Sequence, residues 1–106
     1  MSVLSENRKV YFNYEIIETF EAGIELRGFE VKSIKASRAN LTGAFATIKG
    51  DEIWLTNADI PPYQPKNTPA DYDPTRSRRL LLKKSEIKYL TGKMTSERLT
   101  VVPLKL

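Results

Sequence analysis

Residues 44–56 have the sequence AFATIKGDEIWLT, and this stretch decides the fold. Two runs, 44–48 and 52–56, are rich in the β-branched and aromatic residues that strands favour. Between them, Lys49, Gly50 and Asp51 form the short glycine-containing connection that is typical of a hairpin. The stretch therefore predicts two antiparallel strands joined by a tight turn.

Two further segments have the pattern of strands. Residues 10–20 alternate between apolar and polar residues, which predicts a strand with one buried face. Ile17 and Glu18 break the alternation, so a bulge is expected there. Residues 99–104 predict a last strand, at an edge or interrupted because Pro103 cannot donate a hydrogen bond.

Two short helices are expected between the strands. Apolar residues at roughly helical spacing predict the first over residues 25–37. Residues 79–82 lead into the second, at about 84–90, with Ser85 as its N-cap and Gly92 just beyond its end.

The remaining segment, residues 60–75, holds five of the six prolines and predicts a structured loop. The chain has 106 residues, of which 41% are hydrophobic and 28% charged, so it can build one modest core. Short strands with two helices between them predict an α+β fold, a small and mainly antiparallel barrel, as a single domain over residues 1–106.

Several classes of function are poorly supported. The chain has no Cys and no His, which removes disulfides, thiolate and imidazole metal sites and a histidine base. Asp71 and Asp73 are the nearest approach to a carboxylate pair, and such residues beside a proline more often start turns than bind a metal. A metal-dependent hydrolase built on them stays open as a weak alternative. We expect no catalytic residue, metal, cofactor or small-molecule substrate.

No apolar run is long enough to cross a bilayer, and the N-terminus does not have the pattern of a signal peptide. A cytoplasmic protein without membrane partners is expected.

The net charge of +4 is concentrated in two blocks. Residues 75–88 carry a net charge of +5, and residues 27–38 carry +3. The guanidinium groups of Arg76, Arg78 and Arg79 suit phosphate oxygens, so RNA or DNA binding and an ordinary solvated surface both stay open for this block. Taken alone, the block over residues 27–38 is typical of a solvated surface. If both blocks share one face, they focus the positive potential, and the candidate RNA-binding set then includes Lys32 and Lys35.

Three aromatic residues have alternative roles. Tyr63 is expected to pin the proline-rich loop, and Tyr72 either pins it or stacks on an unpaired base. Trp54 lies among apolar neighbours and is expected in the core.

Motifs in order along the chain resemble those of the SsrA-binding protein (small protein B) family. The stretches that carry the resemblance are 20–24 (FEAGI), 28–34 (GFEVKSI), 39–41 (ANL), 62–63 (PY), 73–82 (DPTRSRRLLL) and 99–104 (LTVVPL). With the shorter stretches 7–9, 14–16 and 86–87, the match runs in order along nearly the whole chain. The combination is specific, although no single motif would be.

The resemblance implies an oligonucleotide-binding-fold barrel and an RNA-binding protein that is not an enzyme. Its implied partners are the tRNA-like domain of transfer-messenger RNA and the stalled ribosome, where the nascent chain is tagged and the ribosome recycled. Family members continue past Leu106 with a further strand and a basic tail, so a C-terminally truncated chain is expected.

The resemblance also assigns RNA-binding residues, which we expect to share one exposed surface. They are Glu21, Asn40, Leu81 and Lys83, together with the arginines Arg76, Arg78 and Arg79. Many relatives have His or Asn at the position of Lys83, so a plain charge contact is expected there. A generic module for single-stranded oligonucleotides is the main alternative function.

Overall fold

A computed structural model describes residues 6, 7, 15, 16 and 18–106 of the chain. Its strands are β1 (Gly23–Ile24), β2 (Phe45–Lys49), β3 (Glu52–Thr56) and β4 (Arg78–Leu81). Its helices are α2 (Gly28–Lys35), α3 (Lys84–Ser96) and the short 3-10 helix η1 (Pro65–Asn67).

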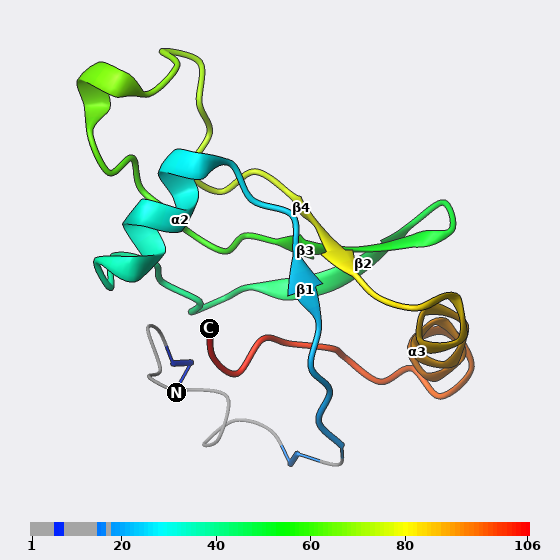
Figure 1. Cartoon of the computed structure of the whole chain (residues 1–106). Coiled ribbons are helices and arrows are strands. Elements are labelled where there is room, and N and C mark those ends of the chain that lie inside the picture. The colour runs from blue at the N-terminus through cyan, green and yellow to red at the C-terminus, as the bar shows by residue number, and fades with distance from the viewer. Residues whose placement is uncertain (1–5, 8–14, 17) are drawn as a thin grey trace.

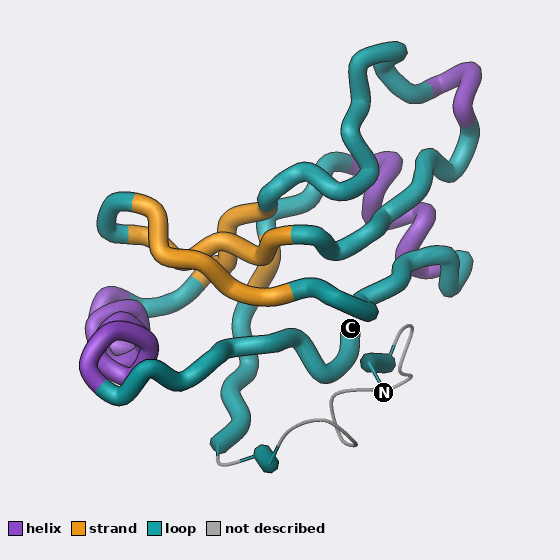
Figure 2. Tube along the Cα trace, turned by 180° about the vertical axis from the view of Figure 1, so that it is seen from behind, coloured by secondary structure: helices purple, strands orange, loops and turns teal. Residues whose placement is uncertain are grey.

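The four strands form one antiparallel sheet in the order β1-β4-β3-β2 (Figure 1). Helix α2 lies at one end of this sheet and α3 at the other, and the loop that carries η1 projects beyond α2 (Figures 1 and 2). The α+β class is confirmed. The sheet is open, so the word barrel describes it only loosely.

The predicted hairpin is confirmed, with β2 and β3 paired from Phe45↔Thr56 to Lys49↔Glu52. Gly50 in the turn has a φ of 63°, in the left-handed region that glycine adopts without steric cost. The first helix and the proline-rich loop are also confirmed, with the helix shortened to residues 28–35.

Other boundaries differ from the sequence-based expectations. Residues 78–81 form a strand rather than the approach to a helix, and α3 continues to Ser96 with Lys83 as its N-cap. Both cap predictions are wrong, because Ser85 and Gly92 lie inside α3.

The predicted end strands are not formed within the described residues. Residues 99–104 run beside β2 with one backbone hydrogen bond, from Ala46 N to Val101 O (2.8 Å), and do not form a strand. Residues 15, 16 and 18–20 are not in a strand either, and the rest of the predicted strand over 10–20 lies outside the described residues. The buried Asn7 ties the two ends together, since its backbone N donates to Leu104 O (2.7 Å).

The core lies on one face of the sheet, which we call the inner face. Ile53 and Leu55 of β3 are buried there, and the residues between and beside them lie on the opposite, outer face. Leu90 of α3 packs against Ile53, and Leu80 of β4 contacts both parts of the core. One apolar layer therefore joins the hairpin, β4 and α3.

Truncation of Ile53 tests this core. Its side chain has no exposed surface, so we expect Ile53→Ala to lower the free energy of unfolding by about 2–5 kcal/mol. Urea denaturation followed by circular dichroism measures the loss. The exposed Lys66→Ala should change the value by no more than about 0.5 kcal/mol. An equal response of the two variants would contradict the assignment of Ile53 to the core.

Candidate nucleic-acid interface

The arginines of the basic run do not point the same way. Arg78 pairs with Leu55 across the sheet and Arg79 with Trp54, so Arg78 faces inward and Arg79 outward. Trp54 is half-buried on the outer face, with Lys49 Nζ 5.5 Å from its ring centre, so its prediction as a core residue is wrong.

Arg78 is completely buried, and all five of its N–H groups are bonded inside the protein. Its Nε donates to Glu30 Oε2 (2.7 Å), its Nη1 to the carbonyls of Ala58 (2.8 Å) and Arg76 (3.1 Å), and its Nη2 to Tyr72 and Pro74 (both 2.9 Å). The expectation that Arg78 lies on an exposed surface is therefore wrong. A guanidinium group can be buried only when its donors are satisfied in this way.

Glu30 of α2 is the centre of this cluster and is also completely buried. It accepts hydrogen bonds from Arg76 Nη2 (2.5 Å), from Arg78 Nε, and from the backbone N of Arg27 (2.7 Å). Burial by itself would raise the pKa of Glu30. The hydrogen bonds from Arg76, Arg27 and Arg78 outweigh burial and lower the pKa from 4.5 to about 2, so the carboxylate stays ionised.

Tyr72 joins the proline-rich loop to the same cluster. Its hydroxyl lies 2.7 Å from the carbonyl of Ile60 and 3.0 Å from Glu30 Oε2, and its ring packs edge-on against Phe29 at 4.7 Å. Of the two roles considered for Tyr72, these contacts favour pinning the loop. Arg38 holds Tyr63, through a hydrogen bond to its carbonyl (3.1 Å) and a position over its ring.

Arg79 lies on the outer face between two carboxylates. Its guanidinium group donates to Glu25 (2.8 Å) and to Glu52 (3.2 Å), and these hydrogen bonds raise the pKa of Arg79. The side chain is 38% exposed. All three arginines are thus paired with acidic residues, which the count of charges along the sequence did not show.

Leu81 and Lys83 follow Arg79 at two-residue intervals, and both are exposed. Leu81 pairs with Gly23 of β1, and Glu21 lies two residues before Gly23, just as Lys83 lies two residues after Leu81. Three predicted RNA-binding residues therefore lie along one edge, which we call the β1–β4 edge: Glu21, Leu81 and Lys83.

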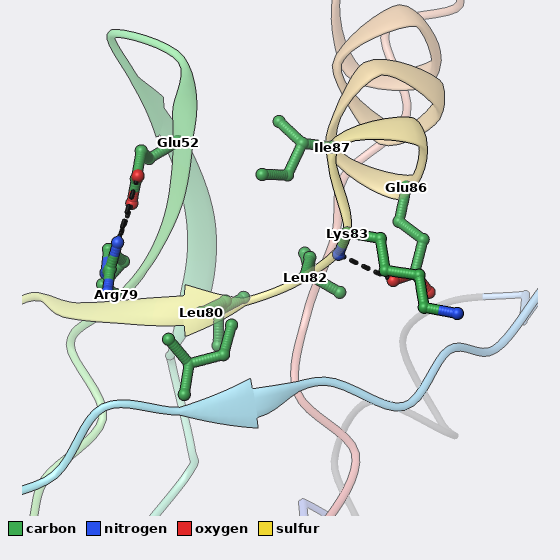
Figure 3. A pocket seen from close by; sticks show the side chains of 8 residues that line it. Glu52, Arg79, Leu80, Leu82, Lys83, Glu86 and Ile87 are labelled. Atoms are coloured by element: carbon green, nitrogen blue, oxygen red, sulfur yellow. Dashed lines mark hydrogen bonds and ion pairs between the residues drawn. The ribbon is translucent and has the colours of Figure 1, made fainter.

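A shallow pocket of about 370 Å³ opens beside this edge (Figure 3). Leucines 80–82 and Ile87 supply its apolar lining, and the ion pair between Glu52 and Arg79 lies at one side. Lys83 and Glu86 lie at the other side, where the backbone N of Lys83 donates to Glu86 Oε1 (2.9 Å). An apolar lining with charged sides suits a base and its phosphate.

The remaining predicted residues do not join this edge. Asn40 lies between α2 and β2, where its side chain accepts a hydrogen bond from Thr42 N (2.9 Å). Lys32 and Lys35 are exposed on α2, at the opposite end of the sheet from α3 (Figure 1). Lys32 and Lys35 are therefore not part of the β1–β4 edge.

The loop carboxylates form a turn. Asp73 accepts hydrogen bonds from the backbone N and the hydroxyl of Thr75 (both 2.9 Å). These bonds form the kind of turn that the sequence favoured over a metal site. Among residues 6, 7, 15, 16 and 18–106, no three potential ligands are grouped around a metal site. No helix of the same residues has the length and apolar character needed to span a membrane.

The family model described as SmpB protein matches residues 4–106. The chain belongs to the SmpB family.

Relatives within the SmpB family match over the whole chain. The SsrA-binding protein of Synechococcus elongatus is 50% identical over 106 residues, which are 100% of this chain and 69% of the relative. The SsrA-binding protein of Thermosynechococcus vestitus is 51% identical over 106 residues, 100% of this chain and 70% of that protein. A solved chain described as "tmRNA-SmpB: a journey to the center of the bacterial ribosome" is similar with a TM-score of 0.75 and 49% identity, over 94% of this chain and 69% of that one.

Sequence reasoning missed Glu30, although it lies inside the 28–34 motif that carried the family resemblance. A charged residue four positions before the apolar Ile34 in a short helix was the available signal, since such a residue must have a partner if it is buried.

The pH dependence of stability tests the Glu30 cluster. A carboxylate whose pKa is lowered on folding stabilises the protein above its unfolded value, here 4.5, and this contribution disappears as the pH falls to about 2. We expect the free energy of unfolding to fall by about 3 kcal/mol as the pH is lowered from above 4.5 to about 2. Urea titrations at a series of pH values measure the loss.

Glu30→Gln should remove this pH dependence and, at neutral pH, lower the free energy of unfolding by about 3–5 kcal/mol, because it leaves a buried guanidinium group without its anion. The control is Glu97→Gln, which breaks the exposed pair with Lys93 (2.9 Å) and should cost less than about 1 kcal/mol. An unchanged acid transition in Glu30→Gln would refute the role given to this carboxylate.

Proposed function

We propose that residues 1–106 act as one RNA-binding domain that binds the tRNA-like domain of transfer-messenger RNA and helps to deliver it to stalled ribosomes. There the nascent chain is tagged and the ribosome is released. The protein acts as an adaptor in the cytoplasm and not as an enzyme. The observation that carries this proposal is the match of this whole chain to SsrA-binding proteins, whose name states what they bind.

The β1–β4 edge supports the proposal in physical terms. Leu81 is 47% exposed beside a shallow pocket, so it offers an apolar contact to a base. Lys83 supplies a cation for a phosphate, and Glu21 can accept hydrogen bonds from base or sugar donors. Arg78, which is buried, holds β4 in place. Arg76 and Arg79 contribute mainly by forming ion pairs with their acidic partners within the protein.

A generic single-strand binder is the second candidate function, because aromatic and cationic groups on an open sheet face bind any strand. Trp54 and Phe45 lie on the outer face and could stack on bases. Competition separates the two functions. A folded tRNA-like RNA should resist displacement by an unstructured RNA of equal length only if recognition depends on its shape.

The binding experiment uses fluorescence anisotropy with a labelled tRNA-like domain of transfer-messenger RNA. We expect Leu81→Ser combined with Lys83→Gln to weaken binding about tenfold or more, because one apolar contact and one charged contact are lost. Lys66→Gln, in the exposed η1 region, is the matched control and should bind as the unmodified chain does. Easy displacement by unstructured RNA would refute the shape-specific function.

A further inference from the structure

We propose that the RNA phosphates bind to three lysines at the start of α3, and not to the arginine run that precedes them. The lysines are Lys83, Lys84 and Lys88, and we call them the lysine ridge. This inference rests on the proposed function, since it names the part of the chain that holds the phosphates of the same RNA.

Ion pairing reduces what the arginines can offer. Arg78 has no exposed surface, and Arg76 keeps only a quarter of its side chain exposed while it holds Glu30. Arg79 is shared between Glu25 and Glu52, so two carboxylates already oppose its charge. A phosphate approaching Arg79 would have to displace or oppose two carboxylates.

The lysine ridge differs in each of these respects. All three side chains are exposed, and none of them forms an ion pair with a carboxylate of the described residues. Lys93, further along the same helix, is paired with Glu97 at 2.9 Å. The unpaired cations of α3 are thus gathered at its beginning, next to the pocket and the β1–β4 edge.

The position of the ridge is unfavourable for the isolated protein. Lys84 and Lys88 are four residues apart in α3, so their like charges lie on the same side of the helix and repel. Lys83 is the N-cap and Lys84 the first helical residue, where the helix dipole is positive and disfavours cations. Only Glu86 lies in the first turn to oppose them. A bound polyanion removes both penalties.

The geometry also connects the ridge with the predicted site. Lys83 borders the pocket, and its ammonium group points away from the leucine side chains toward solvent (Figure 3). Lys84 and Lys88 continue from it along the first two turns of α3. A strand of RNA that placed a base against Leu81 would therefore lead its next phosphates along these turns.

The lysines of α2 are the competing surface. Lys32 and Lys35 are also exposed and unpaired among the described residues, but α2 lies at the opposite end of the sheet from α3 (Figures 1 and 2). They cannot hold phosphates that follow directly from a base at Leu81.

The salt dependence of binding tests the inference, since each phosphate contact adds to the slope of log affinity against log salt concentration. The probe is the tRNA-like domain of transfer-messenger RNA, measured with the full chain and with three double variants. We expect Lys84→Gln with Lys88→Gln to reduce the slope by roughly 1.4–1.8, the value for two lost contacts. The α2 pair Lys32→Gln with Lys35→Gln and the control pair Lys66→Gln with Lys105→Gln should leave the slope unchanged.

The unfolding midpoint in urea is the second measurement. The Lys84→Gln and Lys88→Gln pair should leave it equal or higher, because the substitutions relieve repulsion at the start of α3. An unchanged slope, a reduction in the α2 variant instead, or a lowered midpoint would each overturn the inference. Failure of the unmodified chain to bind this RNA would instead overturn the proposed function.

Discussion

The carboxylate of Glu30 is the interaction on which the rest of the structure depends. A carboxylate without exposed surface must be paired and fully hydrogen-bonded, or its desolvation would prevent folding. The partners of Glu30 come from the start of α2, from the proline-rich loop, and from Arg76 and Arg78 before and at the start of β4, which are 3, 42 and 46–48 residues away along the chain. One anion therefore fixes how the loop returns to the sheet and where β4 begins.

The position of Arg78 in turn sets which residues of β4 reach the surface. Side chains alternate along a strand, so an inward Arg78 requires Arg79 to face outward, Leu80 inward and Leu81 outward. A shift of one residue would expose Leu80 and bury Arg79 with its two acidic partners. The β1–β4 edge thus owes its composition to a pairing on the other face of the sheet. A buried arginine can thus set which side chains the proposed binding surface presents, although it does not touch that surface.

The elements that the sequence predicted correctly are those with local causes. The hairpin at 44–56 and the helix at 28–35 depend on short-range pattern and turn chemistry, and the prolines of 60–75 exclude regular structure by themselves. The errors have non-local causes. Arginines and leucines in 78–82 have no strand preference of their own, and they form β4 because β3 and Glu30 are there to pair with them. For the candidate site, the edge residues came from family motifs, whereas charge counting alone chose arginines that the fold neutralises.

The distinction between total charge and available charge has a wider consequence for this chain. Residues 75–88 carry a net charge of +5, yet the acids that neutralise their arginines come from outside the block, at positions 25, 30 and 52. A long-range potential depends on the sum of all these charges, but a phosphate at contact distance responds to the exposed, unpaired ones. Arginine suits the buried positions because its planar group can satisfy five donors at once, as Arg78 does. Lysine, a compact and hydrated charge on a flexible stem, suits an exposed contact that must adapt to a ligand. The order of residue types along 76–88, first arginines and then lysines, thus follows the path of the chain from the interior to the surface.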